Sequence, residues 1–193
     1  MIRKAIFGVA AAAAVAAPLA LAAPAQASES IGDGNPYNFD IVNAAISATN
    51  ADDALAGLDS YTAFLPNDRA FEVLAKNKGL IQAKYGATVN EQQIFDALVA
   101  GLGVDKIEAV LLYHVVPNAT LRGADVLAGS RVKSLTMADG NQLKVYVVSK
   151  STPYIVLGDK DGRWFNDYVI KSKINMIDTP TAVAHGISDV LLP

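Results

Sequence analysis

The sequence of 193 residues contains no cysteine. This absence excludes disulfide bonds, a lipid-modified N-terminal cysteine, a cysteine nucleophile, thiolate metal sites and iron–sulfur clusters. The only histidines are His114 and His185. A catalytic zinc site needs three protein ligands, so we predict no metal and no cofactor. A domain formed by this chain must therefore be held together by its apolar core, which a chain of this length is able to supply.

The chain also lacks the patterns of several enzyme classes and of nucleic-acid binding. It has no Gly-x-Ser-x-Gly elbow, no P-loop and no His-Glu-x-x-His motif. Gly101-Leu102-Gly103 lacks the third glycine of a dinucleotide-binding fingerprint. There are 16 basic and 19 acidic residues and no Lys/Arg cluster, whereas nucleic-acid binding depends on neutralising phosphates. We therefore predict a protein that is not an enzyme and has no nucleic-acid partner.

Long apolar runs are scarce, and the one that is present lies at the N-terminus. Arg3 and Lys4 precede an alanine-rich stretch over residues 5–23, followed by Ala25-Gln26-Ala27. A positive start, an apolar run and a small-x-small site are typical of a signal peptide. A membrane anchor is the alternative, but Pro18 and Pro24 interrupt the run. We predict a signal peptide over residues 1–27, no membrane span after its cleavage, and a secreted, extracellular product.

After a polar lead-in over residues 28–37, the pattern predicts one domain over residues 38–193. Helical spacing or capping residues predict helices within 39–58, from Asn67 or Asp68 onward, from Thr88 to 102, and from Asp105 until Pro117 stops the helix. Strands are predicted over 61–65, on both sides of an Asp139-Gly140 turn, and over 154–157, 163–170, 174–177 and 187–192. Helices first and strands later indicate an α+β fold, with helices packed on an antiparallel sheet.

Three segments, in order, resemble the fasciclin (FAS1) family. They are residues 62–71 (Thr-Ala-Phe-Leu-Pro-Asn-Asp-Arg-Ala-Phe), residues 112–116 (Leu-Tyr-His-Val-Val) and residues 185–193 (His-Gly-Ile-Ser-Asp-Val-Leu-Leu-Pro). The resemblance implies a secreted, single-domain, bacterial type of member. It also implies the FAS1-type fold, a β-sandwich-like wedge of antiparallel strands with helices packed around it.

Within these segments we assign a structural role to Thr62, Phe64, Pro66, Asn67, Phe71 and His185. The chain departs from the family pattern at two places. Thr181-Ala182 stands where the family usually has Asn-Gly, a turn that needs a positive φ. Met176-Ile177 stands where some animal members have an Asp-Ile pair linked to integrin adhesion, so the resemblance does not carry that activity to this chain.

Four residues are candidates for binding. In the family the pair Tyr113-His114 is associated with adhesion, yet His114 shares a helical stripe with hydrophobic residues, which favours a buried, hydrogen-bonded imidazole. Tyr113 lies about 100° around the helix, so we expect a partly exposed contact there. Trp164 and Phe165 either plug a sheet edge or form a contact patch.

The resemblance implies an extracellular interaction module that mediates adhesion, or association with a surface or matrix, by binding protein or polysaccharide. The alternative is an extracellular carrier of a small ligand such as a pigment, haem or sugar. Such a carrier would use a pocket between helices and sheet.

Overall fold

The structure is a computed structural model that describes residues 31, 33–82, 90–128, 132–148, 154–160 and 167–193. Helices precede most strands along the chain, so the α+β class predicted from the sequence is confirmed. Over the described part of the chain, no helix combines the length and the apolar character needed to cross a membrane.

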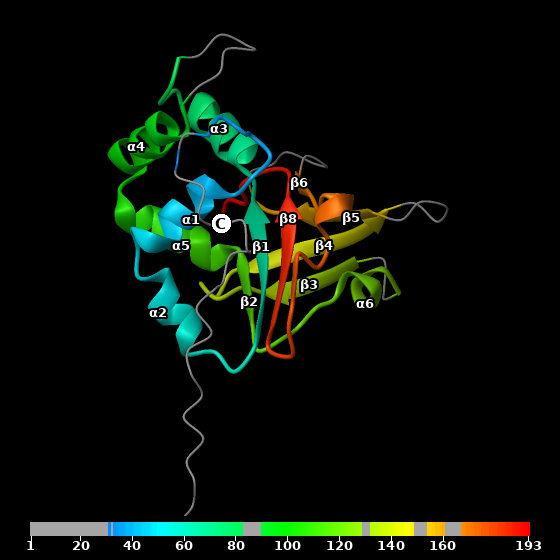
Figure 1. The fold of residues 1–193 in the computed structure, drawn as a ribbon. Coiled ribbons are helices and arrows are strands. Elements are labelled where there is room, and N and C mark those ends of the chain that lie inside the picture. The colour runs from blue at the N-terminus through cyan, green and yellow to red at the C-terminus, as the bar shows by residue number, and fades with distance from the viewer. Residues whose placement is uncertain (1–30, 32, 83–89, 129–131, 149–153, 161–166) are drawn as a thin grey trace, which may run out of the picture.

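Five helices gather on one side of the molecule, as Figure 1 shows. They are α1 (Asp40–Ser47), α2 (Ala51–Ala56), α3 (Asp68–Asn77), α4 (Glu91–Leu102) and α5 (Val104–Tyr113). The predicted helical stretch over 39–58 is therefore two helices. A sixth, short helix, α6 (Gly123–Ala128), lies apart from this group beside the strands.

Within the described ranges, the strands form two four-stranded sheets. One has the order β2-β1-β8-β7, with β2 (Val115–Pro117), β1 (Tyr61–Pro66), β8 (Ala182–Ile187) and β7 (Ile177–Asp178). The other has the order β3-β4-β5-β6, with β3 (Val132–Thr136), β4 (Gln142–Val148), β5 (Tyr154–Gly158) and β6 (Asp167–Tyr168). A 3₁₀ turn, η1 (Lys171–Lys173), follows β6.

The second sheet is antiparallel throughout, but the first is mixed because β1 and β8 run parallel. Tyr61 pairs with Ala182, and the register continues to Pro66 opposite Ile187. Both strands are buried along their whole length, as strands covered on both faces are. The all-antiparallel expectation was therefore wrong at the centre of the first sheet.

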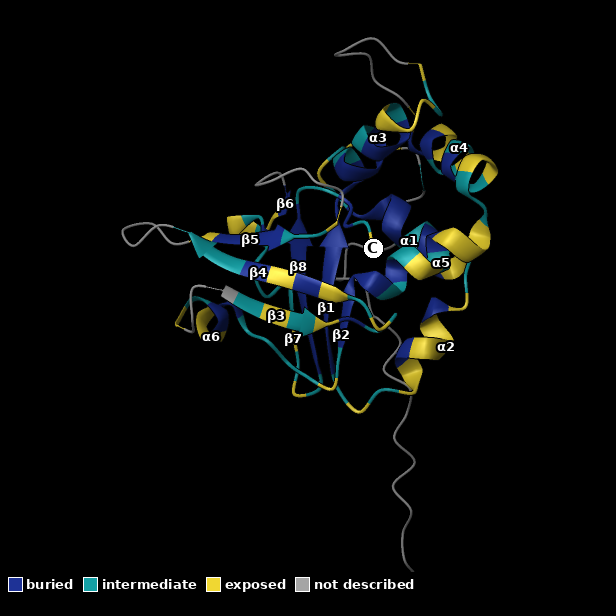
Figure 2. Ribbon diagram, turned by 180° about the vertical axis from the view of Figure 1, so that it is seen from behind, coloured by how far each residue is buried: buried dark blue, intermediate teal, exposed yellow. Residues whose placement is uncertain are grey.

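Two apolar clusters form the core. One lies between the helices and the first sheet and includes Ile41, Phe71, Leu98, Leu111 and Ala184. The other includes Phe64, Tyr113, Leu143, Leu157 and Ile187, and so joins residues of both sheets. Figure 2 shows the buried residues concentrated along β1 and β8, between these two clusters. The first sheet is therefore the central layer of the domain.

Helix starts were predicted correctly only in part. Asn67 caps α3, since its side-chain oxygen accepts a hydrogen bond from the backbone N–H of Ala70 at 3.0 Å. The cap of α4 is Asn90, not Thr88, which lies outside the described residues. The helix α5 begins at Val104 after Gly103, whose φ of 83° favours glycine, so Asp105 is inside the first turn and is not the cap.

Two boundaries were misplaced because tertiary pairing overrides local pattern. The helix expected to continue to Pro117 ends at Tyr113, and Val115–Pro117 instead forms β2 against β1. The last strand was expected over 187–192, but β8 ends at Ile187, where its partner Pro66 cannot donate a further hydrogen bond. The segment expected as a strand over 174–177 contributes only its last residue to a strand.

The turn before β8 forms without Asn-Gly. Neither Thr181 nor Ala182 has a positive φ. The hydroxyl of Thr179 accepts a hydrogen bond from the N–H of Ala182 at 2.8 Å and donates one to the carbonyl of the same residue at 3.1 Å. A side-chain hydroxyl therefore closes this turn in place of a glycine.

Candidate functional site

His114 lies at the C-terminal end of α5 and is only 3% exposed. Its Nδ1 lies 2.7 Å from the carbonyl oxygen of Val110, and its Nε2 accepts a hydrogen bond from the N–H of Leu191 at 2.9 Å. This pattern requires a neutral imidazole with its proton on Nδ1. Burial lowers the pKa of His114 to about 4. The ring therefore ties the end of α5 to the C-terminal segment, as expected for a buried, hydrogen-bonded imidazole.

Tyr113 is fully buried, which contradicts the expectation of a partly exposed contact. Its hydroxyl donates a hydrogen bond to the carbonyl oxygen of Gln142 at 3.1 Å, and burial is the main reason that its pKa is raised to about 12. The helical-wheel argument assumed that only one side of α5 is covered. The last turn of α5 instead has core on both sides, since Leu111 lies in one cluster and Tyr113 in the other.

His185 in β8 is also engaged through both ring nitrogens. Its Nε2 lies 2.8 Å from the carbonyl oxygen of Leu121, and its Nδ1 accepts a hydrogen bond from the N–H of Asn175 at 3.1 Å. The imidazole stacks on Phe64 with the ring centroids 5.9 Å apart. Burial lowers the pKa of His185 below its usual value. Both histidines of the family motifs thus hold separate segments of the chain together.

The other residues assigned a structural role are also buried. They are Thr62, Phe64, Pro66, Asn67 and Phe71. The hydroxyl of Thr62 donates to the carbonyl of Ala119 and accepts from the N–H of Leu121, both at 2.8 Å. Thr62 and His185 therefore hold the same loop, the one that leads from β2 to α6.

Sequence reasoning missed the role of Asp68. It is 1% exposed, and its carboxylate accepts hydrogen bonds from the N–H groups of Asp40 at 3.2 Å and Ile41 at 2.8 Å. These are the first N–H groups of α1, a helix without a side-chain cap from its own N-terminal residue. Burial raises the pKa of Asp68 to about 7 against the lowering effect of these hydrogen bonds, and Glu91 adds to the rise. Local sequence offers no signal for a cap supplied from another helix.

Two carboxylates near the start of α1 also meet one at the start of α4. Those of Asp33, Asp40 and Glu91 have oxygen atoms within 4.8 Å of one another. The side-chain N–H₂ of Asn38 donates to Asp33 at 3.0 Å and to Asp40 at 2.8 Å. Carboxylate oxygens suit hard cations such as Ca²⁺ and Mg²⁺, so among the described residues this group is the one able to hold a metal.

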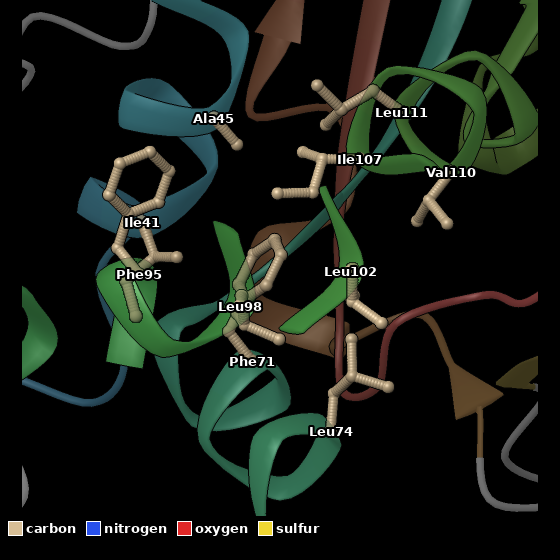
Figure 3. Close-up of a pocket in the computed structure, with 10 residues that line it drawn as sticks. All are labelled: Ile41, Ala45, Phe71, Leu74, Phe95, Leu98, Leu102, Ile107, Val110 and Leu111. Atoms are coloured by element: carbon tan, nitrogen blue, oxygen red, sulfur yellow. The ribbon is translucent and has the colours of Figure 1, made fainter. Parts of the chain in front are cut away.

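A hollow lined only by apolar side chains lies among the helices. Figure 3 shows ten residues from α1, α3, α4 and α5 around it: Ile41, Ala45, Phe71, Leu74, Phe95, Leu98, Leu102, Ile107, Val110 and Leu111. The room inside it for a water-sized molecule is about 20 Å³, which is space for about one water. With no polar group in its lining, this hollow offers a ligand apolar contact and no chemistry.

A second hollow, also with room of about 20 Å³, lies between the sheets. Its lining includes Phe64, Val145 and Ile155, together with two polar side chains, Lys133 and His185. Both ring nitrogens of His185 are already within hydrogen-bond distance of backbone groups, so the imidazole is not placed as a base. Neither hollow brings together a nucleophile and a base. Trp164 and Phe165 lie outside the described residues.

The fold and motif residues define an α+β domain in which two sheets and a helical layer are fastened by buried polar side chains. The Fasciclin domain family model matches residues 37–193, and the chain belongs to this family. Fasciclin domains are in general extracellular adhesion modules and not enzymes.

Among solved structures, the chain is similar to the FAS1 domain pair from the insect cell adhesion molecule Fasciclin I. The TM-score is 0.52 at 16% sequence identity, which shows a shared fold. The match covers 78% of this chain and 43% of that chain, so this chain spans less than half of the length of the insect domain pair. No curated protein matches the chain.

Proposed function

We propose that the chain acts outside the cell as an interaction module, mediating adhesion or association with a cell surface or matrix by binding protein or polysaccharide. The observation that carries the proposal is the match of the fasciclin family model over residues 37–193. The insect protein of similar fold is described as a cell adhesion molecule. The predicted signal peptide over residues 1–27 supports an extracellular location.

Because the Tyr-His pair is buried, the proposed binding is not centred on that pair. Tyr113 and His114 are 0% and 3% exposed, and their polar atoms bond to backbone groups. A partner therefore has no access to these side chains unless the domain opens. Binding must use surfaces elsewhere, and the Tyr-His pair contributes by keeping those surfaces folded.

The test is a pull-down with the exported protein as bait against the surface and matrix fraction of the cells that produce it. A matched control is the variant His114→Ala, which is expected to lose binding only as far as it unfolds. The proposal predicts that wild type as bait retains a protein or polysaccharide, and that an excess of free wild type competes for this partner and prevents its retention. Failure to retain anything above the level of an unrelated acidic protein of similar size would contradict it.

A second candidate function is that of a small-ligand carrier, which would need the helices around the apolar hollow to move apart, because the hollow has room of only about 20 Å³. Its lining of aliphatic and aromatic side chains suits an apolar molecule, since such pockets bind chiefly through burial of apolar surface. An absorbance scan and an organic extract of protein purified from its own source test this directly. A co-purified pigment or lipid in stoichiometric amount supports carriage, and a protein without any extractable molecule argues against it.

A further inference from the structure

The outer face of the second sheet carries a group of tyrosines. The cross-strand register places Tyr146 of β4 opposite Val156 of β5, and Val156 opposite Tyr168 of β6. Tyr154 lies two residues before Val156 and therefore on the same face. We call Tyr146, Tyr154, Val156 and Tyr168 the tyrosine face. Side chains on the opposite face of these strands, such as Leu143, Val145 and Leu157, belong to the core.

The tyrosine face is accessible from outside. Tyr154 is 43% exposed and Tyr168 is 46% exposed, whereas Val156 between the tyrosines is 2% exposed. In Figure 2, β4 lies in front of the first sheet and its ribbon carries buried, intermediate and exposed residues, and no described helix lies in front of it. The apolar surface that a partner can contact therefore consists of tyrosine rings and includes no pocket lined by aliphatic side chains.

The ring of Tyr146 lies against the sheet. Gly158 of β5 pairs with Lys144 and so lies diagonally across from Tyr146. A Cβ atom at Gly158 would come 2.8 Å from Cε2 of Tyr146, so the missing side chain leaves room for the ring beside β5. A ring packed in this way loses little conformational entropy on binding, since tyrosine has only two side-chain torsions.

Charge on this face is sparse. Among the outward side chains of the described strands β3 to β6, only Lys144 is charged. Next to it, Gln142 accepts a hydrogen bond from Ser134 at 2.8 Å and donates one to Thr136 at 2.7 Å. A polyanion would need a cluster of cations, which the outward side chains of these described strands do not provide, so their charge pattern matches an uncharged partner.

We propose that the tyrosine face binds an uncharged, β-1,4-linked polysaccharide, with sugar rings stacked on the tyrosine rings. Tyr146 and Tyr168 stand on the strands to either side of β5, so they are roughly 10 Å apart, which is about one disaccharide unit of such a chain. An extended, ribbon-like glycan can lie across the neighbouring strands β4, β5 and β6 that carry these tyrosines. A protein hot spot usually inserts an anchor side chain into a pocket, and the covered Val156 leaves none within the tyrosine face. This inference rests on the proposed interaction function and names its partner and surface.

The test is co-sedimentation of the full-length chain, as exported, with microcrystalline cellulose and with chitin. We expect retention of wild type on at least one of these solids, unchanged in molar salt because no ion pair is involved. The double variant Tyr154→Ala/Tyr168→Ala should weaken retention by more than tenfold, since stacking on both rings is lost. The matched control is Tyr37→Ala, which removes a tyrosine that is 68% exposed but lies outside the sheets and should leave retention unchanged.

Thermal midpoints of all variants keep the outcome interpretable, because Tyr154 and Tyr168 are solvent-exposed and their removal should leave the fold intact. If neither solid retains wild type, the inference is overturned. Binding of that same protein to producing cells would then leave the interaction function standing. The inference is also overturned if the double variant is retained as well as wild type, or if salt abolishes the retention of wild type. The inference is overturned too if the chain binds a purified surface protein through Tyr154 and Tyr168 but binds neither glycan.

Discussion

Replacing His114 by alanine should destabilise the domain and should do so in a pH-dependent way. The change leaves the N–H of Leu191 without its acceptor in a position that is 0% exposed, and it opens a void where the ring was. The carbonyl of Val110 loses its partner as well. An orphaned buried group costs about 1–3 kcal/mol, and with the void we expect a total loss of about 2–4 kcal/mol near pH 7.5.

The sign of the pH dependence follows from the lowered pKa of His114. Its pKa is about 4 in the folded protein and 6.5 as the ordinary value, so between these limits the unfolded chain binds the proton more readily. The stabilisation by neutral His114 is therefore complete above pH 6.5 and is lost as the pH falls toward 4. A shift of this size corresponds to about 3 kcal/mol.

The assay is denaturant unfolding of wild type and His114→Ala from pH 7.5 to pH 4. Subtracting the free energy of unfolding of the variant from that of wild type removes the contributions of His185 and Asp68, which both proteins contain. As the pH falls, His185 changes stability in the same sense as His114, and Asp68 changes it in the opposite sense. We expect a difference of about 2–4 kcal/mol at pH 7.5 that shrinks to about 1 kcal/mol or less at pH 4. A difference that stays constant over this range would refute the reasoning that His114 is a neutral, buried clamp.

Three further substitutions test other parts of the core. Phe71→Ala should cost about 3–5 kcal/mol, because this side chain is 5% exposed, and a thermal midpoint equal to that of wild type would contradict its place in the core. Tyr113→Phe should cost about 1 kcal/mol through loss of the hydrogen bond to Gln142, and an unchanged denaturant midpoint would contradict that bond. Asp68→Asn should gain stability relative to wild type as the pH rises from 4 to 8, because the raised pKa of Asp68 makes its ionisation costly to the folded state. Equal pH profiles of stability for the two proteins would contradict this.

The exported form supplies a prediction about the N-terminus. If Ala25-Gln26-Ala27 is a cleavage site, protein from the medium begins at Ser28. Intact-mass measurement on the culture supernatant checks this. A chain that keeps Met1 and is found only in the membrane fraction would contradict export by cleavage.

Local signals in the sequence were sufficient for the features that depend on near neighbours. The cap of α3 by Asn67, the hairpin around Asp139-Gly140 and the burial of Phe71 all follow from spacing and turn chemistry. The family motifs then led to the correct fold, because three of them in order specify an arrangement that no single element does.

Features that depend on residues distant in the sequence could not be predicted from it. The parallel pairing of β1 with β8 joins Tyr61 to Ala182, across most of the domain, and no hairpin signal marks it. The same holds for Asp68, which caps α1 from another helix, and for Tyr113, whose outer side is covered by the second core cluster. Periodicity along one helix shows which residues share a side, but not how many sides are covered.

The most direct test of the proposed function is a binding isotherm of the labelled, exported protein on the surface and matrix of the cells that produce it. The proposal predicts saturable binding that excess unlabelled protein displaces and that Tyr37→Ala retains. Binding that rises linearly without saturation, or that an unrelated acidic protein of the same size reproduces, would contradict an extracellular interaction module.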